Sequence, residues 1–159
     1  MTKIKVNVTY KNVNIYFFTY TGNSRKIAEI VASRLNTKPR EIRTYEFPYP
    51  IWLILSFIPY LGVKIDVDKP DESGIILCFP KWTFNCPPIT TFLKKFARGK
   101  EILMIICYGG FDERRYAEFY RNFALKCGAV KAECLLIKRR KLKENSVEVE
   151  KEVEGWLNL

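Results

Sequence analysis

Six consecutive residues, Thr19-Tyr20-Thr21-Gly22-Asn23-Ser24, combine three Ser or Thr hydroxyls, one glycine and one asparagine, and carry no charge. They follow an apolar run (Val13 to Phe18) and precede a segment with helical periodicity (Asn23 to Leu35). Backbone N–H groups at a helix N-terminus, together with hydroxyl side chains, form an anion cradle that suits a phosphate. A plain N-capped turn needs only one of these residues. The loop is therefore predicted to bind a phosphate group.

The loop lacks the glycine and lysine spacing of a nucleotide-hydrolysing P-loop, and it also lacks G-x-G-x-x-G. Two further polar loops, Pro80–Pro88 and Cys107–Asp112, follow the apolar runs Ile75–Phe79 and Ile102–Cys107. In open α/β sheets, ligands bind beyond the carboxyl ends of the strands. All three loops are therefore expected to border one ligand site.

Several kinds of chemistry are excluded by composition. The chain has no histidine, which removes histidine-based triads and metal sites. Its five cysteines form no C-x-x-C pair, so zinc and dithiol motifs are not supported, and Cys107 is expected to be a buried strand-end thiol. No side chain stands out as an acid, base or nucleophile, so no catalytic residue and no metal ligand are predicted. The odd number of thiols and the lack of a signal peptide favour the cytoplasm.

The spacing of apolar residues predicts the elements that position the loops. Strands are expected at Val13–Phe18, Arg40–Glu46, Ile75–Phe79, Ile102–Cys107 and Ala132–Ile137. Helices are expected at Asn23–Leu35, from Pro87, at Asp112–Lys126, and after Asn145, where Glu148 completes a capping box. This alternation predicts one three-layer, doubly wound α/β domain over residues 1–159 with a five-stranded parallel sheet. Alternation at Lys3 to Tyr10 predicts an additional N-terminal edge strand.

The first loop resembles the phosphate loop of the flavodoxins, T-x-T-G-N-[TS]. Pro80-Lys81-Trp82, followed by Pro87-Pro88-Ile89 and Phe92, is similar to the P-x-W…P…F segment of flavodoxin-like proteins, and Cys107-Tyr108-Gly109-Gly110 resembles their strand-four loop. The resemblance covers roughly residues 13–137. It implies the strand order 2-1-3-4-5 and FMN as the cofactor.

The resemblance also implies which residues bind the cofactor: Thr19, Tyr20, Thr21, Gly22, Asn23 and Ser24 for the phosphate, and Pro80, Lys81, Trp82, Thr83, Tyr108, Gly109 and Gly110 for the ring. Trp82 would stack on or edge the isoalloxazine ring. Tyr108 is the candidate for the opposite face, with Phe111 competing for that role. The alternative is that Trp82 is a surface aromatic and that the glycines only form a tight turn.

The net charge of +10 departs from the acidic character of many electron-carrier flavodoxins. It favours an acidic partner, such as a negatively charged redox protein or an anionic lipid surface, although a solvated charged surface also explains it. A basic surround should make the potential of the second flavin reduction step less negative.

Two segments have open interpretations. The apolar run Ile51–Ile58 is either a core-packed short helix or a hydrophobic patch near the flavin rim. Such a patch would contact a partner or dip into an anionic membrane, which would make the protein peripheral to it. The basic run Lys138–Lys143 is either a solvated connection or an electrostatic site, and no specific nucleic-acid binding is predicted.

The sequence therefore predicts an FMN-binding electron-transfer protein. The alternatives are an FMN-dependent NAD(P)H or quinone oxidoreductase, and a flavin-free interaction module that uses the basic and apolar surface.

Overall fold

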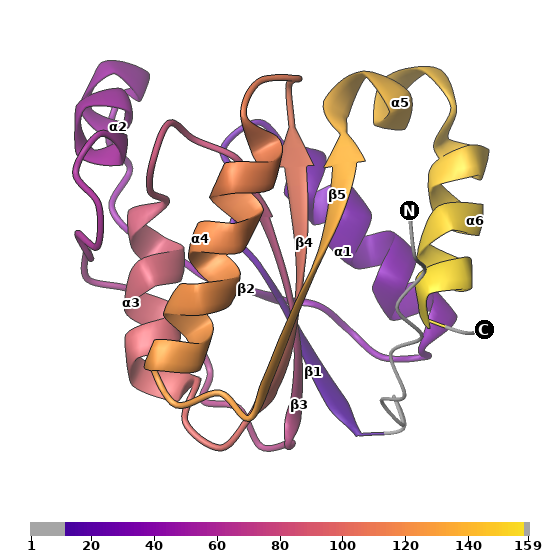
Figure 1. Cartoon of the computed structure of the whole chain (residues 1–159). Helices are drawn as coiled ribbons and strands as arrows, with labels where there is room; N and C mark the ends of the chain where they lie inside the picture. The colour runs from indigo at the N-terminus through magenta and orange to yellow at the C-terminus, as the bar shows by residue number, and fades with distance from the viewer. Residues whose placement is uncertain (1–11, 158–159) are drawn as a thin grey trace.

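Parallel strands alternate with helices through the computed structural model, which describes residues 12–157 (Figure 1). The elements in chain order are β1 (Val13–Phe17), α1 (Asn23–Arg34), β2 (Arg40–Glu41), α2 (Tyr49–Ser56), β3 (Gly74–Pro80), α3 (Pro87–Phe96), β4 (Glu101–Tyr108), α4 (Glu113–Lys126), β5 (Lys131–Lys138), α5 (Arg139–Glu144) and α6 (Ser146–Leu157).

The strands form one parallel sheet in the order β2-β1-β3-β4-β5, which confirms the predicted flavodoxin-like topology. The register places Phe17 of β1 beside Cys78 of β3, and Cys78 beside Ile105 of β4. The strands β1, β3 and β4 are almost entirely buried, as their continuous apolar sequences require.

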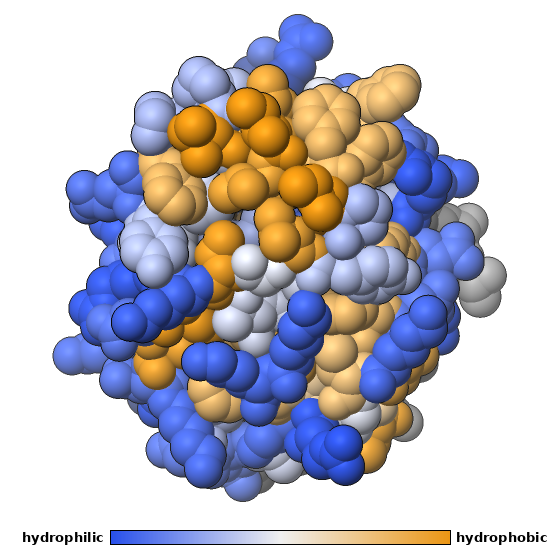
Figure 2. Space-filling model, turned by 90° about the vertical axis from the view of Figure 1, so that its left-hand side faces the viewer, coloured by the Kyte–Doolittle hydropathy of each residue, from blue (hydrophilic) through white to orange (hydrophobic). Residues whose placement is uncertain are grey.

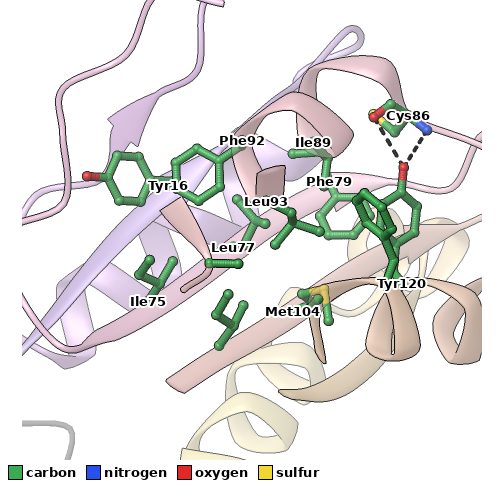
Figure 3. Packing of buried hydrophobic residues seen from close by; sticks show 14 of the residues in the cluster. Tyr16, Ile75, Leu77, Phe79, Cys86, Ile89, Phe92, Leu93, Met104 and Tyr120 are labelled. Atoms are coloured by element: carbon green, nitrogen blue, oxygen red, sulfur yellow. Dashed lines mark hydrogen bonds between the residues drawn. The ribbon is translucent and has the colours of Figure 1, made fainter. Parts of the chain in front are cut away.

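Helices cover both faces of the sheet, and side chains alternate between the two cores. Tyr16, Leu77 and Met104 pack toward α3 and α4, where the core is rich in aromatic rings (Figure 3). Ile15, Ile76 and Ile105 face α1 and α6 on the other side. The three-layer architecture is therefore confirmed.

The strand predicted over Arg40–Glu46 is wrong beyond Glu41. The Ile42 amide donates the last hydrogen bond to β1, at the Phe17 carbonyl (2.8 Å), and β1 ends there. With no neighbouring strand left to pair with, the chain leaves the sheet, and Arg43 forms an isolated antiparallel bridge with Asp66.

Other local predictions are confirmed, apart from one that lies outside the described residues. The Asn145 Oδ1 accepts the Glu148 amide (3.2 Å), and its Nδ2 donates to the Glu148 carboxylate (3.1 Å), so this pair caps α6.

The edge strand predicted at Lys3 to Tyr10 falls among the residues that the structure does not describe. Within residues 12–157, no helix has both the length and the apolar character needed to cross a membrane.

The loop between β3 and α3 is fixed by a buried tyrosine. The Tyr120 hydroxyl of α4 accepts the Cys86 amide at 2.7 Å (Figure 3). The same hydroxyl lies 3.0 Å from Asn85 Oδ1. Asn85 in turn donates through Nδ2 to the Ile58 and Leu61 carbonyls, at 3.0 and 2.8 Å. One network, whose Tyr120 and Asn85 side chains are buried, therefore joins α4, the loop after β3 and the loop after α2.

Tyr120→Phe should lower the free energy of unfolding by about 1–3 kcal/mol, because it leaves the buried Cys86 amide without its acceptor. Urea denaturation measures this change. Tyr45→Phe, at an exposed tyrosine, is the matched control and should stay within about 0.5 kcal/mol of the unchanged protein. Equal effects of the two substitutions would contradict the role given to Tyr120.

Candidate functional site

Three loops leave the carboxyl ends of β1, β3 and β4 at one edge of the sheet, at the top of Figure 1. They span Phe18–Gly22, Lys81–Cys86 and Gly109–Asp112. Because the strands are parallel and adjacent, loops from distant parts of the sequence meet here. The two connections that flank this edge carry α2 and α5.

The first loop is shaped by its own side chains. The Thr19 hydroxyl accepts the Gly22 amide (2.8 Å), and the Asn23 side-chain amide donates to the Thr21 hydroxyl (3.2 Å). Gly22 precedes the helix with φ 95°, a left-handed conformation that glycine adopts without steric penalty. The chain therefore turns sharply from β1 into α1.

The N-terminus of α1 has free hydrogen-bonding capacity. No side chain caps it, and its first turn holds no acidic residue. The Ser24 hydroxyl in this turn is 1% exposed and has no hydrogen-bond partner among the described residues. Such a buried, unpaired hydroxyl costs about 1–3 kcal/mol in a folded protein. An anion at the helix N-terminus would accept from this hydroxyl, so the residues present fit a phosphate.

A cleft of about 790 Å³ opens between α2, the other two loops and α5. Its walls combine aromatic rings, glycine backbone and charged side chains. The lining residues are Tyr49, Trp52, Leu53, Ser56, Lys81, Trp82, Thr83, Phe84, Gly109, Gly110, Phe111, Asp112, Arg115 and Arg139. A volume of this size accepts a ligand with a large aromatic ring system.

The cleft and the first loop are joined by aromatic contacts. The Tyr20 ring of the loop lies 5.8 Å from the Tyr49 ring of α2. The Trp82 ring lies 5.4 Å from Phe18, the residue that follows β1, and 5.3 Å from Trp52. These centroid distances are those of packed aromatic pairs, so the two parts of the site are in direct contact.

The predicted site residues divide into two groups. The cleft is lined by five of the residues predicted to bind the ring: Lys81, Trp82, Thr83, Gly109 and Gly110. Thr19 to Ser24 form the separate loop described above, which adjoins the cleft through Tyr20. Pro80, the last residue of β3, is not among the described residues that line the cleft.

Phe111 occupies the position expected of Tyr108. Phe111 lines the cleft and is 80% exposed. Tyr108, the last residue of β4, is not among the described lining residues, and partial burial raises its pKa. Of the two aromatic candidates for the ring, Phe111 therefore has the better position.

Charged groups at the cleft are mainly basic. Lys81, Arg115 and Arg139 line it beside the single lining carboxylate among the described residues, Asp112. Arg115 pairs with Asp112 (2.5 Å) and also lies 5.0 Å from the centre of the Phe84 ring. Partial burial lowers the pKa of Lys81, although Asp112 opposes this change. With Asp112 already paired, the cleft favours a negatively charged ligand.

Two further segments contribute to the site. The helix α2 provides four lining residues, and one of the two interpretations of its apolar sequence, a hydrophobic patch near the flavin rim, placed it beside the site. The basic run Lys138–Lys143 was expected as a solvated connection or an electrostatic site, but from Arg139 onward it is the helix α5, and Arg139 reaches the cleft. A Cβ atom on Gly109 would lie 3.3 Å from the Arg139 guanidinium, so this glycine permits the close approach.

The cysteines do not enter the site. Cys107 is 5% exposed, and burial raises its pKa to about 11, so its thiol stays protonated at neutral pH. Among the described residues, no group of three or more potential ligands could hold a metal ion.

One relative establishes a family for this chain. An uncharacterized protein of Archaeoglobus fulgidus is 65% identical over 147 residues, which cover 92% of this chain and 99% of the relative. No model of a known protein family matches the sequence.

Solved structures with low sequence identity share the fold. A crystal structure from Bacteroides uniformis aligns with a TM-score of 0.71 at 15% identity, covering 93% of this chain and 98% of the other. A flavoprotein from Lactobacillus acidophilus NCFM in complex with FMN aligns with a TM-score of 0.62 at 20% identity, covering 88% and 97%.

An NADH:FMN oxidoreductase in its apo form also aligns, with a TM-score of 0.58 at 13% identity, covering 93% and 90%. At these identities the likeness shows the fold alone. The chain therefore belongs to one family with the Archaeoglobus fulgidus protein, and the fold of this family is flavodoxin-like.

Proposed function

We propose that this protein binds one FMN noncovalently and transfers electrons. The observation that carries the proposal is the unpaired, buried Ser24 hydroxyl at the uncapped N-terminus of α1, next to a cleft with aromatic and glycine walls. A phosphate would pair the hydroxyl and the helix amides, and the attached aromatic ring would enter the cleft. When bound, the flavin supplies the redox chemistry.

The first loop would hold the phosphate through neutral donors. The Thr21 and Ser24 hydroxyls and the amides of the first helical turn can donate to its oxygens, while Thr19 keeps Gly22 in its turn. The partial positive charge of the helix N-terminus favours the anion by about 0.3–1 kcal/mol or more. The loop therefore needs no lysine to bind a dianion.

The cleft would hold the ring between Trp82 and the loop of Gly109 and Gly110. The Trp82 ring packs against the Phe18 and Trp52 rings, and these contacts fix its position. The glycines let the backbone approach a ligand closely. Phe111, which is exposed in this structure, would cover the ring and exclude water from it.

The cations Lys81 and Arg139 would stabilise negative charge on the reduced ring. Positive charges near a flavin stabilise its anionic reduced form and so make its reduction potential less negative. This arrangement supports the less negative potential of the second reduction step that the sequence predicted.

A carrier role is further tested by adding NADH or NADPH to the FMN-loaded protein without a reductase. We expect no bleaching of the flavin absorbance, and rapid bleaching would instead indicate an oxidoreductase.

Ser24→Ala should stabilise the ligand-free protein but reduce the additional stabilisation that FMN gives. In the ligand-free protein it removes an unpaired buried hydroxyl and improves helix propensity, so the free energy of unfolding should rise by about 0.5–2 kcal/mol. FMN at 100 times its Kd should stabilise the unchanged protein by about 2.7 kcal/mol, and the variant should bind roughly tenfold more weakly. Urea unfolding with and without FMN measures both changes.

Ser33→Ala, at an exposed position of the same helix, is the matched control and should retain the full stabilisation by FMN. Thr21→Val and Asn23→Ala should also lose most of it. An absorption spectrum of the untreated protein gives an independent test through the flavin bands. If FMN at high concentration stabilises neither the unchanged protein nor the control, the proposal fails.

Arg139→Gln should make the potential of the second flavin reduction step more negative, on the order of tens of millivolts, because it removes a positive charge beside the ring. Redox titration of the FMN-loaded protein measures this shift. Arg98→Gln, an exposed charge in the loop after α3 at the opposite edge of the sheet, is the control and should leave the potential unchanged. Shifts of equal size would show that only the net charge matters.

A further inference from the structure

The helix α2 exposes most of its apolar side chains. Only Trp52 and Ser56, one turn apart, are buried. Ile54 is 61% exposed, Phe57 just after the helix 52%, and Ile58 47%. The core-packed interpretation of this segment is therefore wrong, because a helix that is apolar on all sides can bury only one of them against the protein.

The exposed side chains are held on a fixed support. Trp52 packs against Phe18 and Trp82, with ring centroids 6.1 and 5.3 Å away. The Phe84 amide donates to the Ser56 carbonyl (2.9 Å) at the end of the helix. The helix is therefore anchored from below while its outer sides remain in solvent.

These side chains form one surface, which we name the α2 ridge. It consists of Tyr49, Ile51, Leu53, Ile54, Phe57, Ile58 and Tyr60. Figure 2 shows the hydrophobic side chains gathered on the upper part of this face, with hydrophilic residues below and to the sides. Figure 1 places α2 at the periphery of the molecule, beyond α3 and α4.

The ridge itself is uncharged, but its border is basic. No charged residue occurs from Phe47 to Val63. The Lys94 ammonium donates to the Tyr60 carbonyl (2.8 Å), so it lies at one end of the ridge. Arg115 lies over the Phe84 ring, which packs 5.8 Å from the Phe57 ring.

The cleft extends the basic border, since Lys81 and Arg139 line it together with Tyr49 and Leu53 of the ridge. Two carboxylates oppose these cations: Asp112 is paired with Arg115, and Glu46 immediately precedes the uncharged segment. The border therefore carries a net positive charge. An apolar surface with a cationic border is complementary to an anionic lipid interface.

We propose that the α2 ridge docks into the surface of an anionic lipid bilayer. The aliphatic side chains and Phe57 enter the boundary between headgroups and acyl chains, and Tyr49 and Tyr60 lie at headgroup level, where tyrosine is favoured. Lys94 and the cleft cations contact the lipid phosphates.

Other occupants fit less well. A second copy would bring an identical basic border and a net charge of +10 against the first. A protein partner would need about one hydrogen bond per 100–200 Å² of interface, whereas the side chains of the ridge offer only two tyrosine hydroxyls. Because Tyr49 and Leu53 belong to both the ridge and the cleft, lipid docking would bring the cleft next to the membrane surface.

Flotation with vesicles tests the proposal. The full chain is mixed at low salt with vesicles of equal parts phosphatidylglycerol and phosphatidylcholine, and bound protein is scored on a gel, so the result does not depend on flavin. The unchanged protein should float with these vesicles, bind pure phosphatidylcholine vesicles much less, and dissociate at high salt. Ile54→Glu should weaken partitioning about tenfold or more, because it removes an exposed aliphatic side chain that would be buried in the bilayer on docking.

Val147→Glu is the matched control. It introduces the same charge at an exposed helical valine (59% exposed) on α6, on the other side of the molecule, and should bind nearly as well as the unchanged protein. Lys94→Gln should weaken binding roughly fivefold, whereas Lys151→Gln, at an exposed lysine of α6 on the other side of the molecule, should not. Urea unfolding of each variant shows that the fold is retained.

Three results would overturn the proposal: failure of the unchanged protein to float with the anionic vesicles, equal losses for Ile54→Glu and Val147→Glu, or equal binding to both kinds of vesicle. A dimer in sedimentation that Ile54→Glu abolishes, without vesicle binding, would assign the ridge to a second copy instead. Vesicle binding without any effect of FMN on stability would leave the ridge in place and remove the cofactor proposal.

Discussion

The parallel pairing of β3 with β1 and β4 is the constraint on which the described structure depends. These strands are buried on both faces, so their side chains are apolar and their backbone groups bond to one another. Polar chemistry is possible only where the strands end. Because the strands are parallel, the three loops that leave them reach the same edge, and this places a hydroxyl-rich turn next to an aromatic cleft.

The site combines two parts with different physical requirements. The turn at Thr19 to Ser24 offers donors that the protein itself leaves unused, most clearly the Ser24 hydroxyl. The cleft offers apolar rings and close backbone approach, and it depends on side chains braced from several elements. The buried network around Tyr120 links these elements, since it ties the loop carrying Trp82 to α4 and to the segment after α2. Contacts made by residues outside the cleft therefore contribute to its shape.

The helix α2 connects the proposed cofactor site with the proposed lipid contact. Its inner side holds Trp82 through Trp52, and its outer side is apolar and bordered by cations. A single short helix can do both because only one of its sides meets the protein. The cations around the cleft and the α2 ridge would attract both the reduced flavin and the lipid phosphates, since both are anionic.

The sequence by itself determined the alternation of strands and helices and the three loops, because continuous apolar runs, helical periodicity and turn residues are local signals. The strand order was implied by the resemblance to the flavodoxins. The sequence also predicted Trp82 and the two glycines as residues of the site, since they lie in the loops that follow β3 and β4. Tertiary structure alone decided which of Tyr108 and Phe111 lines the cleft, since the answer depends on how the chain turns after the end of β4. It also decided that α2 faces solvent and that Arg139 reaches the cleft. An apolar helix has the same sequence whether it is buried or exposed, and a basic run does not reveal what lies beside it, because both depend on contacts between residues that are distant in the chain.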